Sequence, residues 1–229
     1  MSALPHAQPQ DPEADSAGAV SEPSEAAADA PLPTPGRKRP KPGERRVQIL
    51  QTLAAMLEHP GAERITTAAL AARLQVSEAA LYRHFASKAQ MFDGLIEFIE
   101  GSVFTLVNQI TERETVPSQQ VRRIAVVLLQ FGEKNPGMVR VMVGDALVFE
   151  HERLNARMNQ FFERVESQLR VGLRAAAEAA GSPTHTVDAQ ALASALTALV
   201  VGRLQRYARS GFKRLPTEHL EPALARLVQ

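Results

Sequence analysis

The spacing of apolar residues constrains the fold of this chain more than any other feature of its sequence. From Glu44 onward, apolar residues recur at intervals of three and four, and proline or glycine interrupts the pattern near Pro60, Pro117, Pro136 and Gly181. Such spacing predicts amphipathic helices separated by turns. No segment alternates apolar and polar residues cleanly, as a half-buried strand does. We therefore expect an all-α fold of about nine helices.

We expect three parts along the chain. Residues 1–43 form an acidic tail and a basic arm, residues 44–90 hold a helix-turn-helix, and residues 91–229 form a helical domain for dimerisation and partner binding. The expected helices cover about 44–57, 66–74, 77–85, 87–111, 118–134, 138–143, 150–180, 187–209 and 216–229. Small residues in the eighth helix permit close approach of another helix, so we expect a homodimer joined mainly through the last two.

The first 36 residues contain six acidic residues and no lysine or arginine. They are dominated by alanine, proline, serine and acids, lack aromatic residues, and cannot bury enough apolar surface to offset the entropy of ordering. We expect a disordered tail. Because the whole chain carries +1, this −6 leaves +7 on the remaining residues. The tail is either a solvated extension or an acidic segment that competes for basic surface.

A basic cluster follows the tail and leads into the first helix: Arg37, Lys38, Arg39, Lys41, Arg45 and Arg46. Pro40 and Pro42 keep its first half out of a helix. A basic arm ahead of a DNA-binding unit can contact phosphates or enter a minor groove. We expect Arg45 and Arg46 to contact DNA, and the alternative is a solvated charge patch.

The composition and motifs argue against several other classes of protein. Without cysteine there are no disulfides or thiolate sites, which fits a reducing compartment. No signal sequence is visible, and no stretch approaches the roughly 20 apolar residues of a membrane span. The chain lacks phosphate-binding loops, dinucleotide fingerprints and nucleophile elbows, and His151 with Glu152 lacks a second histidine. We expect no enzyme activity, cofactor, metal or membrane partner.

The most informative segment is TTAALAARLQVSEAALYRHFASK, residues 66–88. Thr66 or Thr67 can cap one short helix and Ser77 can cap another, and Gln75 and Val76 form the turn between the two. Two short helices joined in this way form a helix-turn-helix, whose second helix enters a major groove. The helix at 66–74 can pack closely against the one that follows it through small residues, namely Ala68, Ala71 and Ala72.

The candidates for DNA contact are Thr66, Ser77, Ala79, Tyr82, His84, Lys88, Arg45 and Arg46. Hydroxyl groups can donate to phosphates or base edges, and alanine can meet a thymine methyl group. Lys88 and Thr66 lie at helix starts, where a phosphate can bind. His84 has two interpretations, a phosphate contact or a hydrogen-bonded, partly buried side chain.

The run LYRHFASK that closes the helix-turn-helix resembles the TetR family of dimeric DNA-binding proteins. ITTAALAARLQVSEAALYRHFASK, MFDGLIEFIE, FGEKNPG and FFERVESQLR together resemble the nucleoid occlusion factors within that family, across residues 44–229. The resemblance implies dimers bound to specific, near-palindromic chromosomal sites and a cytoplasmic, nucleoid-associated location. It also implies antagonism of the tubulin-like division protein FtsZ.

The FtsZ-binding surface implied by this resemblance corresponds to Phe98, Val127, Gln130, Lys134 and Asn135. The chain departs from the expected pattern at 106, 127, 130 and 134, most clearly at Leu106, where an arginine is expected. Judged by local sequence alone, Phe98 could equally be a core residue. Lys134 could equally be a solvated charge at a helix C-terminus.

Two other functions remain compatible with the sequence. A ligand-responsive TetR-type repressor would use a polar-lined pocket in the C-terminal domain. A helical adaptor would bind protein partners and no DNA. Release of DNA by a small molecule would identify the repressor, and an absence of specific DNA binding would favour the adaptor.

Overall fold

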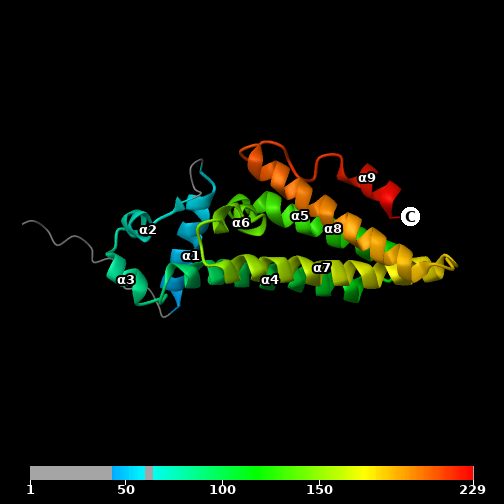
Figure 1. Cartoon of the computed structure of the whole chain (residues 1–229), viewed down its shortest axis with the longest axis horizontal. Coiled ribbons are helices and arrows are strands. Elements are labelled where there is room, and N and C mark those ends of the chain that lie inside the picture. Colours follow the sequence, from blue (N-terminus) through cyan, green and yellow to red (C-terminus); the bar gives the residue numbers. More distant parts are fainter. Residues whose placement is uncertain (1–42, 60–63, 229) are drawn as a thin grey trace, which may run out of the picture. The chain divides into compact units, whose positions relative to one another are not determined.

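The computed structural model describes residues 43–59 and 64–228, and all the regular structure in those ranges is helical. The prediction of an all-α fold is confirmed, with nine α-helices in the described part of the chain (Figure 1). The acidic tail and most of the basic arm lie outside the described residues. The α-helices are α1 (Glu44–Leu57), α2 (Thr67–Leu74), α3 (Glu78–Tyr82), α4 (Lys88–Arg113), α5 (Pro117–Lys134), α6 (Pro136–Met142), α7 (Glu152–Ala179), α8 (His185–Arg209) and α9 (Leu220–Leu227). A short 3-10 helix, η2 (Asp145–Leu147), precedes α7.

Side-chain caps define the starts of the three helices around the turn. Thr66, Ser77 and Ser87 each accept a hydrogen bond from the backbone N–H three residues further on, at 3.1, 3.3 and 3.2 Å. Each bond satisfies an N–H that a helix start leaves unpaired. Gln75 takes a left-handed conformation, with φ of 57°, and so ends α2 and turns the chain toward α3. The predicted caps at Thr66 and Ser77 and the predicted turn are confirmed, whereas α3 ends at Tyr82 and not near Phe85 as expected.

The last helix begins later than expected. Pro216 predicts a helix start, but α9 begins at Leu220 and residues 216–219 form turns. Arg203 of α8 donates to the carbonyl oxygens of Pro216 and Glu218, at 3.0 and 2.8 Å. His219 is left-handed, with φ of 52°. In a helix that started at Pro216, these carbonyls would accept hydrogen bonds from backbone N–H groups further along the helix. Here they accept hydrogen bonds from Arg203.

The C-terminal helices pack around one apolar core. The pair α7 and α8 makes the most extensive contact, while α5 packs against α4, α7 and α8. Figure 1 shows α4 and α7 running along each other, with α8 crossing nearby. Buried apolar residues supply the interior of this packing, including Ile99, Val103, Leu128, Phe161, Leu169 and Leu196.

The helix-turn-helix is joined to these helices rather than set apart from them. The described residues fall in a single compact unit, because α1 packs on α6 and on α4. At Gly137 of α6, an added Cβ atom would lie 2.0 Å from the carbonyl oxygen of Ala54 in α1. The two backbones therefore meet with no side chain between them.

By length and composition alone, α8 could cross a membrane, so the expectation that no segment is apolar enough is wrong by that test. A core helix passes the same test, and one such helix is weak evidence for a span. Only a third of its most apolar window is buried within one chain. The remainder includes a row of small exposed residues, Ala191, Ala195 and Ala198.

Candidate nucleic-acid interface and partner surface

The helix-turn-helix packs through its large apolar residues and one alanine. Ala71 is buried as expected, but Ala68 and Ala72 are exposed, so their predicted packing role is wrong. The reason is that Leu70 and Leu74 already fill the inner side of α2. A hydrogen bond of 2.6 Å from the Thr67 hydroxyl to the Glu78 carboxylate also ties α2 to α3. The remaining inward residues are Leu81 and Phe85.

The outer face of α3 presents the side chains expected to meet DNA. Ser77, Ala79, Tyr82 and His84 are all exposed, and 46% of the surface of Tyr82 is exposed. Thr66 is exposed at the start of α2, next to Thr67, whose hydroxyl binds Glu78 of α3. The structure therefore gathers five of the eight predicted DNA contacts around α2 and α3.

The two arginines of the arm that lie within the described residues are held by their own chain. Arg46 lies with its guanidinium 4.1 Å from the centre of the Phe85 ring and donates to the backbone carbonyl of His84. Arg45 donates to the Gln48 side chain at 2.7 Å. Through these contacts, Arg46 holds the start of α1 against the residues that follow α3.

Lys88 begins α4, three residues after Phe85, and is the last of the predicted DNA contacts. Its ammonium lies 2.5 Å from a carboxylate oxygen of Glu150, in the segment that leads into α7. The ammonium also lies 5.7 Å from the centre of the Phe92 ring. Sequence reasoning missed Glu150, because 62 positions separate the partners and no local pattern relates them.

A second loop contact near α2 was also missed. The guanidinium of Arg64, just before α2, lies 5.9 Å from the centre of the Phe149 ring. Val148 and Phe149 are 65% and 67% exposed. The only signal in the sequence was the pair of adjacent apolar residues ahead of a helix start, and such a pair more often marks a core segment.

A further set of ion pairs joins α4 to α7. Arg153 and Arg157 of α7 bind Asp93 of α4, and Arg157 also binds Glu100 at 2.6 Å. The hydrogen bonds that Arg157 donates to Glu100 are the main cause of the raised pKa of Arg157, and partial burial opposes it. These bonds connect α4, the first helix after the helix-turn-helix, to the long α7.

The residues of the implied partner surface lie on α4, on α5 and at the end of α5. Phe98 is 49% exposed, so the alternative that it is a core residue is wrong, and its ring centre lies 6.3 Å from that of Phe131. Gln130 and Lys134 are exposed and Val127 is half-buried. The remaining member, Asn135, is half-buried and donates to the Phe131 carbonyl at 2.8 Å.

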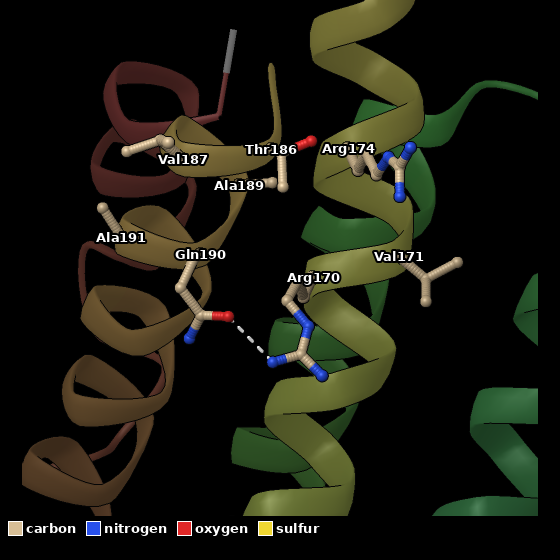
Figure 2. A pocket seen from close by; sticks show the side chains of 8 residues that line it. All are labelled: Arg170, Val171, Arg174, Thr186, Val187, Ala189, Gln190 and Ala191. Atoms are coloured by element: carbon tan, nitrogen blue, oxygen red, sulfur yellow. Dashed lines mark hydrogen bonds between the residues drawn. The ribbon is translucent and has the colours of Figure 1, made fainter. Parts of the chain in front are cut away.

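A groove runs between α7 and α8 on their outer side. Figure 2 shows Arg170 and Arg174 of α7 facing Thr186 and Gln190 of α8, with a hydrogen bond of 2.8 Å from Arg170 to Gln190. Further along the same helix pair, a second hollow is lined by Phe162, Glu166, Thr197 and Val201, among others. The buried hydroxyl of Thr197 has no hydrogen-bond partner among the described residues.

Comparison with known proteins defines the class. Residues 49–95 match the family of bacterial regulatory proteins called tetR, and residues 114–228 match an SlmA-like model described as a tetracyclin repressor-like C-terminal domain. The regulator PfmR from Thermus thermophilus superposes with a TM-score of 0.66 at 20% identity, covering 79% of this chain and 97% of its own. FadR from Bacillus subtilis superposes with a TM-score of 0.63 at 12% identity, covering 80% and 97%. The chain is thus a TetR-type helix-turn-helix regulator.

Closer relatives define the group within that class. The nucleoid occlusion factor SlmA of Photobacterium profundum is 52% identical over 184 residues, which cover 79% of this chain and 92% of the relative. SlmA of Salmonella paratyphi B is also 52% identical, over 77% of this chain and 89% of its own. The chain belongs to the SlmA family of nucleoid occlusion factors. The resemblance noted in its sequence is confirmed.

Proposed function

We propose that this protein is a nucleoid occlusion factor that binds specific chromosomal sites as a dimer and antagonises FtsZ ring assembly over the nucleoid. The observation that carries the proposal is the exposed outer face of α3, capped and braced as a recognition helix, in a chain 52% identical to SlmA over most of its length. Binding and proximity account for such a role without catalysis, cofactor or metal. The protein acts in the cytoplasm, on the nucleoid, with no membrane partner.

The DNA contacts divide into two kinds. Ser77, Ala79 and Tyr82 face the base edges, where hydroxyl and methyl groups can distinguish sequences. The start of α2 at Thr66 and the start of α4 at Lys88 bind phosphates, which position the protein without reading sequence. The side chains of Arg45, Arg46 and His84 add phosphate contacts at the side of α3, and Arg46 does so while its guanidinium remains close to Phe85.

The dimer is joined mainly through α8. Its exposed row of Ala191, Ala195 and Ala198 lets a second copy approach closely. The apolar residues Leu220 and Leu224 of α9 are buried within their own chain, so α9 adds less to the interface than its sequence predicts. Two-fold symmetry then presents two α3 helices to near-palindromic half-sites.

The surface for FtsZ centres on Phe98. An exposed aromatic ring beside a polar edge, here Gln130 and Lys134, is the composition of a protein-binding surface. Val127 and Asn135 contribute at its border, where both are half-buried. DNA holds several dimers near one another and so raises the local concentration of this surface.

Genome-wide occupancy in living cells tests the proposal. We expect many sites dispersed over the chromosome and few near the replication terminus, and we expect purified protein with site DNA to inhibit FtsZ assembly. A Tyr82→Ala variant serves as the control for occupancy through α3. Occupancy confined to one or a few promoters would instead identify a ligand-responsive repressor. Absence of specific sites would identify an adaptor.

A further inference from the structure

The contact between Lys88 and Glu150 joins the start of α4, directly after the helix-turn-helix, to the segment before α7. The ammonium and a carboxylate oxygen lie 2.5 Å apart, and the side chains are 26% and 8% exposed. Glu150 is therefore well shielded from water, although it lies next to the exposed Val148 and Phe149. A shielded pair of this kind is screened less by salt than a pair on the open surface.

The position of Lys88 makes this pairing consequential for DNA binding. Lys88 is the first residue of α4, directly after the cap Ser87, and the proposed function assigns it to a phosphate. A lysine that neutralises a phosphate releases a counterion from the DNA, and this release supplies part of the affinity. An ammonium that already touches a carboxylate offers a phosphate much less net charge. A phosphate bound there would also lie close to the negative charge of Glu150.

We propose that Glu150 competes with DNA phosphate for Lys88 and thereby sets the affinity and the salt dependence of DNA binding. The inference rests on the proposed function, since it requires that DNA reach the start of α4. The segment before α7 and the DNA backbone are alternative partners for one ammonium. Glu150 thus weakens binding to any DNA sequence. The base contacts of α3 then contribute a larger share of the affinity for DNA.

The test compares wild-type protein with Glu150→Gln on site DNA over a range of salt concentrations. Glutamine keeps the shape and a hydrogen-bond acceptor but removes the charge. We expect binding about fivefold tighter at low salt, the upper range for one partly exposed ion pair. The slope of log affinity against log salt should steepen by about 0.9, the value for one added phosphate contact.

Glu100→Gln is the matched control. It raises the net charge equally and removes an α4–α7 ion pair, the 2.6 Å contact with Arg157, without touching Lys88. Its affinity and slope should stay near the wild-type values. Thermal unfolding of both variants checks that neither has lost its fold.

A double variant separates competition from a general effect of charge. In a Lys88→Ala background, Glu150→Gln should gain little, since the shared ammonium is gone. A Glu150→Gln variant that binds no tighter than wild type, or gains equally without Lys88, would overturn the inference. Failure of wild-type protein to bind its site would instead contradict the proposed function.

Discussion

Tyr82 carries the sharpest prediction for a single side chain. It projects from the last turn of α3 with 46% of its surface exposed, while the neighbouring Leu81 is buried. Tyr82→Ala should weaken site binding by about 1–3 kcal/mol, the usual range for a well-placed base-edge contact. Fluorescence anisotropy with site and non-site DNA measures the change. Tyr82→Phe separates the hydroxyl from the ring, and equal affinity for all three proteins would remove Tyr82 from the interface.

Phe98 makes the corresponding prediction for the partner surface. Phe98→Ala should cost about 2 kcal/mol in FtsZ binding, as expected when an exposed aromatic anchor is removed. DNA affinity should not change, because Phe98 lies on α4, outside the helix-turn-helix. Val116→Ala is the control, since Val116 is also exposed, at 48%, but precedes α5 and lies outside the proposed surface. If only Val116→Ala lost FtsZ binding, the FtsZ-binding surface would lie at Val116 and not at Phe98.

Local sequence predicted those residues whose role depends on near neighbours. Thr66 and Ser77 cap helices because their hydroxyls reach an N–H three positions away, a rule visible in the sequence. The partner of Lys88 could not be predicted, because Glu150 is 62 positions distant and only the packed fold brings the two together. His84 shows an intermediate case, since its backbone carbonyl binds Arg46 while its side chain remains exposed.

At the scale of elements, the contact between α1 and α6 depends on Gly137. Gly137→Ala should destabilise the protein by about 1–3 kcal/mol or more, because the new methyl group would overlap the Ala54 carbonyl and the two helices must separate. Gly101→Ala in α4 is the control. Its Cβ would meet nothing within 4 Å, so it should stabilise the helix by about 0.5–1 kcal/mol. Chemical denaturation measures both, and equal stabilities would contradict the packing described.

The start of α8 predicts a dependence of stability on pH. The hydroxyls of Thr184 and Ser182 donate to the Asp188 carboxylate, at 2.7 and 2.9 Å, and lower its pKa. A lowered folded-state pKa stabilises the protein above the pKa of the unfolded chain, about 3.9. That contribution is lost as the pH falls through the folded value. Unfolding of wild type and Asp188→Asn should therefore differ at pH 6 and converge in acid, whereas a difference that grows in acid would refute this.

The helix boundaries show what periodicity can and cannot determine. The starts of α2 and α3 agree with the sequence, because threonine and serine caps are local signals. Pro216 is an equally good local signal, yet α9 starts four residues later. Arg203, more than ten positions earlier, binds the carbonyls that a helix from Pro216 would need. Boundaries set by a distant side chain are outside the reach of local rules.

For the whole molecule, the row of small residues on α8 predicts how the dimer can be broken. Ala195→Arg should yield a monomer at micromolar concentration, because a long charged side chain prevents close approach at the centre of the row. Ala225→Arg, at an exposed position of α9, should remain a dimer. Sedimentation of both variants without DNA distinguishes the helices. The opposite pattern would assign the interface to α9, and a wild-type monomer would contradict the dimer altogether.

The backbone contact at Gly137 has a consequence for which DNA the dimer can read. With no side chain between α6 and α1 at Gly137, no side chain can shift there to let the helix-turn-helix tilt against the C-terminal helices. In the proposed dimer, the distance between the two α3 helices is then fixed. Such a dimer selects DNA by the spacing of the half-sites as well as by their base sequence. Half-sites with the correct bases, moved one base pair out of the one-turn spacing of about 34–36 Å, should be rejected.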